Sequence, residues 1–153
     1  MKYAVATFAQ AKDLTPNMVP VSTAVTDPSW FHNFRDADHI TTDDNGILCG
    51  FRAEKMTPAP HDHATCGKGQ FEGKGCTHDP ATCAYLREYR EQLDSLDAEA
   101  TLKSIENRIK DTGKTDFDTI VFLYLSSASH ACSEGSVICA WLNGLGIECE
   151  EMK

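Results

Sequence analysis

The sequence predicts one α/β domain over residues 1–153, built on a small, mainly parallel sheet with flanking helices. Residues 119–125 (TIVFLYL) are apolar and β-branched without alternation, as in a strand that is covered on both faces of a parallel sheet. A helical pattern and another β-prone stretch follow this strand, which predicts a right-handed β-α-β unit. The length of 153 residues and the 41% hydrophobic content suit a single domain with one core.

The first half of the chain predicts two strands and a turn. Residues 2–7 are β-prone, and residues 18–22 form a second strand even though Pro20 removes a backbone donor from the ladder. Asp27-Pro28-Ser29 predicts a turn or short helix. The Asp-Asp-Asn-Gly turn at residues 43–46 predicts a short strand over 47–49. Three aromatic residues follow the first turn, and we interpret them as packing groups: Trp30, Phe31 and Phe34.

The second half predicts helices with clear boundaries. Apolar residues recur at three- and four-residue intervals over residues 80–95, which predicts an amphipathic helix that starts with Asp79 as N-cap and Pro80 in its first turn. Asp97 predicts the cap of the next helix, and Gly113 predicts its end. A third helix is expected over 132–145, followed by a last strand over 147–152.

The charge balance narrows the classes of partner. Lys and Arg number 14 against 23 Asp and Glu, which gives a formal net charge of −9. This acidic balance argues against non-specific nucleic-acid binding, which needs basic side chains against phosphates. It is compatible with good solubility or with a basic protein partner.

The chain contains seven cysteines, and whether they form disulfides depends on the cellular compartment. No apolar run approaches the ~20 residues that cross a bilayer, and residues 1–14 are too quickly polar for a signal peptide. We therefore expect no membrane association and a cytoplasmic protein in a reducing environment. Clustered cysteines in that compartment point to metal binding or catalysis rather than to a disulfide framework.

A Cys/His-rich segment lies at residues 61–83. It contains six residues of the types that bind zinc, and its glycines allow the backbone to bend around an ion. A structureless loop of this length in a compact domain needs something to organise it. The predicted zinc ligands are His63, Cys66, Cys76 and Cys83, with His61 and His78 as alternatives.

Four protein ligands would make a closed, structural zinc site that organises the long loop. Three ligands would leave an open position for catalysis. A metal-free loop, cysteines that only pack and redox-active thiols are the other interpretations of this segment.

A second candidate site follows the strongest strand. Hydroxyls, an imidazole and a thiol gather between this strand and the next helix, where the positive helix end favours an anion. The expected ligand-binding residues are Ser126, Ser127, His130, Cys132 and Ser133. The alternatives are a plain N-cap, or a Cys132 nucleophile with His130 as its base. Cys139 and Cys149 lie in the expected helix and last strand, so we interpret them as core residues.

The order of several short motifs resembles the domain-of-unknown-function family 488. The matching segments together cover about 90 residues, with the Cys/His-rich segment as an insertion. They are Thr7-Phe8-Ala9, Val19-Pro20-Val21-Ser22, Pro28-Ser29-Trp30, Phe51 to Pro58, Tyr89 with Leu93 to Asp97, Trp141-Leu142-Asn143 and Gly146-Ile147-Glu148. The resemblance implies an α/β fold with an undetermined activity, of a kind widespread in bacteria, archaea and their phages.

One departure from the family pattern affects the expected function. The loop of that family carries two cysteines followed by His and Arg. In this chain Tyr124 stands at the first cysteine position, Cys132 at the second, and Ser133 and Glu134 replace the His-Arg pair. The resemblance therefore leaves open whether this chain is an enzyme.

Two hypotheses for function remain. The first is a zinc-binding protein that binds a small anionic or nucleotide-like ligand at the 126–133 loop. The alternative is a non-enzymatic, phage-type acidic interaction or inhibitor protein with a basic host protein as its partner. A zinc hydrolase is disfavoured because no HExxH pattern is present.

Overall fold

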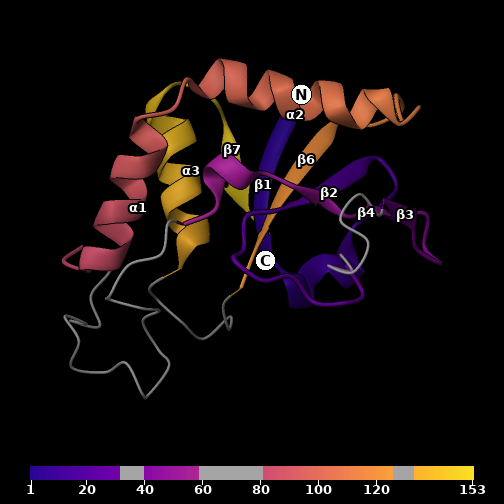
Figure 1. The fold of residues 1–153 in the computed structure, drawn as a ribbon, viewed down its shortest axis with the longest axis horizontal. Helices are drawn as coiled ribbons and strands as arrows, with labels where there is room; N and C mark the ends of the chain where they lie inside the picture. The colour runs from indigo at the N-terminus through magenta and orange to yellow at the C-terminus, as the bar shows by residue number, and fades with distance from the viewer. Residues whose placement is uncertain (32–39, 59–80, 126–132) are drawn as a thin grey trace.

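A five-stranded parallel sheet forms the centre of the molecule (Figure 1). The computed structural model describes residues 1–31, 40–58, 81–125 and 133–153. The strand order is β5-β2-β6-β1-β7, which confirms the predicted α/β fold. The strands are β1 (Lys2–Thr7), β2 (Met18–Ser22), β5 (Phe51–Arg52), β6 (Thr119–Tyr124) and β7 (Cys149–Glu151).

Three α-helices cover one face of this sheet: α1 (Ala84–Asp94), α2 (Ala98–Asp111) and α3 (Glu134–Gly144). Ile120 and Phe122 of β6 belong to the core on this face, together with Leu93, Ile109 and other buried helix residues. Burial of these apolar side chains is the main force that holds the helices on the sheet.

The opposite face of the sheet is covered by shorter elements. These are the 3-10 helix η1 (Phe8–Asp13) and the antiparallel pair β3 (Thr41–Thr42) and β4 (Leu48–Cys49). A further 3-10 turn, η2 (Glu54–Met56), follows β5. Val121 and Leu123 of β6 pack here in a cluster with Phe8 and Ile47. Successive residues of β6 thus enter different cores, which explains its uninterrupted apolar sequence.

Pro20 is accommodated inside β2 by the shortness of β5. Pro20 lies opposite Val121 of β6. On the other side of β2, β5 pairs with only Val21 and Ser22. Within the described residues, Pro20 therefore has no β5 residue opposite it, and its missing N–H costs no ladder bond on that side.

The predicted helix starts need two corrections. Helix α1 begins at Ala84 with Cys83 as N-cap, and residues 81 and 82 form a turn, so the expected start at residue 80 was wrong; Asp79 and Pro80 lie outside the described residues. Helix α3 starts at Glu134 rather than within 132–133, because Ser133 is the extended N-cap residue.

The other boundaries agree with the sequence or shift by a few residues. The Asp97 cap of α2 is confirmed, since its Oδ1 accepts from the N–H of Ala100 at 3.1 Å. Strand β7 is shorter than the predicted 147–152, because the N–H of Ile147 still donates to the carbonyl of Leu142 at the end of α3. Among the described residues, no helix combines the length and apolar character that a membrane span requires.

Candidate functional site

The elements that follow β1 and β6 lie on opposite faces of the sheet. The two strands are parallel neighbours, and Thr7 lies opposite Tyr124 at their carboxyl ends. After β1, η1 contributes Phe8 to the core on one face; after β6, α3 packs in the core on the other face. Such a divergence is where open α/β sheets bind ligands. We therefore take this carboxyl edge as the candidate site.

Hydrogen bonds fix the end of β1 at this edge. The N–H of Thr7 donates to Oε1 of Gln10 at 2.8 Å, and Nε2 of Gln10 donates to the carbonyl of Met152 at 2.9 Å. Gln10 therefore ties the turn after β1 to the end of β7.

A buried ion pair joins the ends of β2 and β5 at the same edge. Nη1 of Arg52 donates to Oδ2 of Asp27 at 2.8 Å, and the exposed side-chain fractions are 15% for Arg52 and 0% for Asp27. The hydroxyl of Ser22 donates to Oδ1 of Asp27, and Nη2 of Arg52 donates to the carbonyl of Ala24 at 2.6 Å. Because the two charges are matched and hydrogen-bonded, we assign this cluster a structural role.

The start of α3 lies against the end of β6. The Oγ of Ser133 accepts from the N–H of Ser136 at 3.4 Å and caps the helix. A Cβ at Gly135 would lie 2.3 Å from Cε1 of Tyr124, so only glycine lets the tyrosine ring lie there. Burial raises the pKa of Tyr124 above its ordinary value. The phenol is therefore neutral at physiological pH.

Helices α1 and α3 begin side by side at this edge (Figure 1). The hydroxyl of Tyr85 in α1 donates to Oε1 of Glu134 in α3 at 2.8 Å. Val137 packs against a small cluster of Cys83, Tyr85 and Leu86. Burial, reinforced by the Glu134 carboxylate, raises the pKa of Tyr85 well above its ordinary value, so Tyr85 remains a hydrogen-bond donor.

Of the residues predicted for the two sites, the structure describes Cys83 and Ser133. The pairing of Tyr85 with Glu134 brings the starts of their two helices to one edge, which the sequence did not reveal. Within the four described ranges, no group of three or more His, Cys, Asp or Glu side chains is placed to hold a metal ion. The other predicted residues lie outside the described ranges: His61, His63, Cys66, Cys76, His78, Ser126, Ser127, His130 and Cys132.

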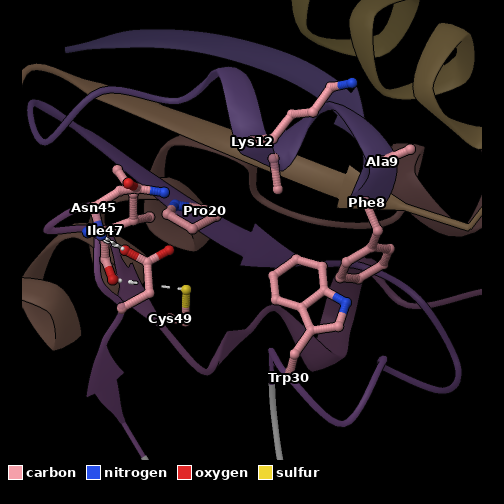
Figure 2. Close-up of a pocket in the computed structure, with 10 residues that line it drawn as sticks. Phe8, Ala9, Lys12, Pro20, Trp30, Asn45, Ile47 and Cys49 are labelled. Carbon is pink, nitrogen blue, oxygen red and sulfur yellow. Dashed lines mark hydrogen bonds between the residues drawn. The ribbon is translucent and has the colours of Figure 1, made fainter.

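A hollow on the face opposite the helices was missed by sequence reasoning (Figure 2). Its volume is about 240 Å³, and its walls include Phe8, Lys12, Pro20, Trp30 and Cys49. Figure 2 shows the Trp30 indole beside the Phe8 ring, with Cys49 across the hollow. The expectation that the aromatic residues pack is confirmed for Phe31, which is buried, whereas Trp30 is 55% exposed. Phe34 lies outside the described residues.

The walls of this hollow combine aromatic and apolar groups with the polar side chains of Lys12, Asp43 and Asn45. Trp30 contacts Phe8 and Phe31 edge-on, with ring centroids 6.1 and 5.9 Å apart. Burial, and then the nearby Asp43 carboxylate, raise the pKa of the Cys49 thiol to about 11. At neutral pH this thiol is protonated and a poor nucleophile.

A larger hollow of about 630 Å³ lies at the amino ends of the central strands. Its walls include Asp118, Glu148, Glu150 and Glu151, together with Lys2. Hydrogen bonds from Thr119 and Asn17 hold the pKa of Asp118 below its usual value. Glu150 and Glu151 belong to the edge strand β7, and Glu148 directly precedes it.

Comparisons of the chain with protein-family models, curated proteins and solved structures gave no match. The resemblance to family 488 therefore stays a prediction.

Proposed function

We propose that this protein binds a small anionic or nucleotide-like ligand at the carboxyl edge of its sheet, at the 126–133 loop. The observation that supports it most is that η1 and α3, which follow the neighbouring strands β1 and β6, pack on opposite faces of the sheet. In open α/β sheets, this arrangement forms a crevice between two adjacent strand ends.

The start of α3 supplies the electrostatic part of the proposal. A helix N-terminus carries a positive partial charge of roughly half an elementary charge. Glu134 lies in the first turn of α3 and offsets this charge. In the resemblance to family 488, Glu134 stands at the position of the arginine of the His-Arg pair. We therefore propose that this chain binds its ligand without the reactive centre of the family that it resembles.

Replacing Glu134 by glutamine should strengthen anion binding about three- to five-fold, which corresponds to a helix-end charge effect of about 0.6–1 kcal/mol. The amide oxygen of glutamine can still accept from Tyr85. Isothermal titration with inorganic phosphate and with adenosine monophosphate would measure the change. Glu99→Gln is the matched control, because Glu99 occupies the first turn of α2; it should leave both affinities unchanged.

The alternative function, an acidic interaction protein with a basic host partner, is favoured by the acidic hollow beside β7. The same titrations separate the two functions. If neither anion binds to the unchanged protein or to Glu134→Gln, the ligand proposal is wrong. Binding of an arginine-rich peptide that weakens steeply with salt would then support the alternative.

We also propose that residues 61–83 bind one structural zinc ion through His63, Cys66, Cys76 and Cys83. In support, Cys83 immediately precedes α1 and is held beside Tyr85 and Leu86.

The zinc proposal predicts about one equivalent of metal in protein purified without a metal-affinity tag. Cys76→Ser and Cys83→Ser should each lower this content at least several-fold, because removal of a zinc ligand weakens binding steeply. Cys49→Ser and Cys139→Ser should leave the zinc content unchanged. Elemental analysis measures all five proteins; less than about a tenth of an equivalent in the unchanged protein would rule out zinc.

A further inference from the structure

Two cysteines that the site does not use lie in contact in the core. Cys139 of α3 and Cys149, the first residue of β7, have their sulfurs 3.1 Å apart. Their exposed fractions are 7% and 6%. A disulfide bond requires about 2.0 Å between the sulfurs, so a shift of about 1 Å in total would join them.

The Asn143 side chain and the turn between α3 and β7 hold the two cysteines close together. Nδ2 of Asn143 donates to the carbonyl of Cys149 at 3.2 Å, and the N–H of Cys149 donates to Oδ1 of Asn143 at 2.9 Å. The intervening turn is closed by the bond from Ile147 to Leu142 and by Gly146 at φ 79°. The sulfurs therefore face each other because the turn between α3 and β7 is fixed, independently of any cross-link.

From this geometry we propose that Cys139 and Cys149 form a reversible dithiol–disulfide site that exchanges with low-molecular-weight disulfides such as glutathione disulfide. Neither residue belongs to the predicted zinc or ligand sites. The cross-link would join α3 to β7, which is an edge strand of the sheet. Since β7 has only three residues, few backbone hydrogen bonds must open to admit the small disulfide.

The exchange balances in two steps. The Cys139 thiolate attacks one sulfur of glutathione disulfide, which forms a mixed disulfide and releases one glutathione thiolate. Cys149 then loses its proton and attacks the Cys139 sulfur, which releases the second glutathione. The pair gives up two electrons and two protons in total, and both glutathione products carry them as thiols.

The pKa directions of the two thiols favour Cys139 as the attacking group. Either thiol can donate across the 3.1 Å contact, and when Cys149 donates, the contact holds the pKa of Cys139 below its usual value. The same contact, followed by burial, raises the pKa of Cys149. Cys139 is therefore the better attacking thiolate and Cys149 the resolving thiol.

The test uses the full chain, folded, in buffers of increasing glutathione disulfide to glutathione ratio. After acid quenching and alkylation, the oxidised protein should carry two alkyl groups fewer than the reduced protein. Once the alkyl groups are subtracted, its intact mass should be lower by two hydrogen masses. Peptide mapping should place the bond between Cys139 and Cys149. The thermal midpoint of the oxidised protein should rise by about 5–10 °C, as expected for closing a loop of this size in a domain of this length.

Two single variants test the assignment. Cys139→Ala and Cys149→Ala should each lose the internal bond, and Cys149→Ala should accumulate a mixed disulfide on Cys139. Cys49→Ala is the matched control, because Cys49 is equally buried but has no cysteine contact among the described residues; it should retain the bond. Absence of the 139–149 bond in the unchanged, folded protein at the most oxidising ratio would overturn the proposal, even if a variant fails to fold.

Discussion

Asp27→Ala will lower the free energy of unfolding by about 3 kcal/mol, the usual cost of removing one partner from a buried ion pair. The Asp27 carboxylate has no exposed side-chain surface and lies 2.8 Å from Nη1 of Arg52. Without it, the guanidinium at the carboxyl end of β5 loses a carboxylate that is fully buried beside it. The Ser22 hydroxyl loses its acceptor as well.

Urea denaturation followed by circular dichroism would measure this loss. Asp94→Ala is the control, since the Asp94 pair with Arg90 is largely exposed and should contribute less than about 0.5 kcal/mol. Adding Arg52→Met to Asp27→Ala should recover part of the loss, because an apolar side chain then replaces the buried guanidinium. Equal small losses for Asp27→Ala and Asp94→Ala would contradict the structural role of the Asp27 pair.

Gly135→Ala will lower the free energy of unfolding by about 2–3 kcal/mol, in the range found for overpacked cores. The added methyl group would lie 2.3–2.9 Å from three ring atoms of Tyr124, and the ring would have to leave its place over the first turn of α3. Alanine is otherwise the better helix former, so a loss of stability here reports the steric contact alone.

Gly144→Ala provides the control in the same helix. Its Cβ would lie 3.6 Å from the nearest atom, Nη2 of Arg90, so the change should be neutral or stabilising by up to about 1 kcal/mol. The double variant Gly135→Ala with Tyr124→Leu should be more stable than Gly135→Ala alone. Urea unfolding of the unchanged protein, Gly135→Ala, Tyr124→Leu and the double variant completes the cycle. If Gly135→Ala matches Gly144→Ala, Tyr124 does not pack against α3 as described.

The sequence predicts the elements whose causes are local. The strand at 119–125 follows from its own apolar residues, and the Asp97 cap follows from a side chain three residues from its donor. The start of α1 was misplaced because Pro80 is acceptable in a first turn, although the observed cap is Cys83. The local sequence pattern therefore predicts the existence of a helix more accurately than it predicts the residue at which the helix begins.

The site was harder to predict, because its contacts join residues that are far apart in the chain. Tyr85 and Glu134 meet only because α1 and α3 pack together. Trp30 was expected to pack, but it lies at the edge of the core, where it contacts Phe8 and stays exposed. Whether an aromatic ring is fully buried depends on the elements that cover it. The sulfur contact between Cys139 and Cys149 forms only because α3 packs beside the first residue of β7. Such tertiary contacts leave no periodic pattern in the sequence from which they could be predicted.

The position of β6 has a consequence for the order in which the molecule assembles. β1 and β2 are formed by the first residues of the chain, but they do not pair with each other; β6 lies between them and pairs with both. During synthesis, β1 and β2 must therefore wait for about 100 further residues before either central ladder can form. Closing such long loops is slow, so the sheet can be completed only late in translation, with β7 added last at its edge. Until then the apolar strands β1 and β2 have no central partner, and this interval is when a nascent chain is most exposed to aggregation.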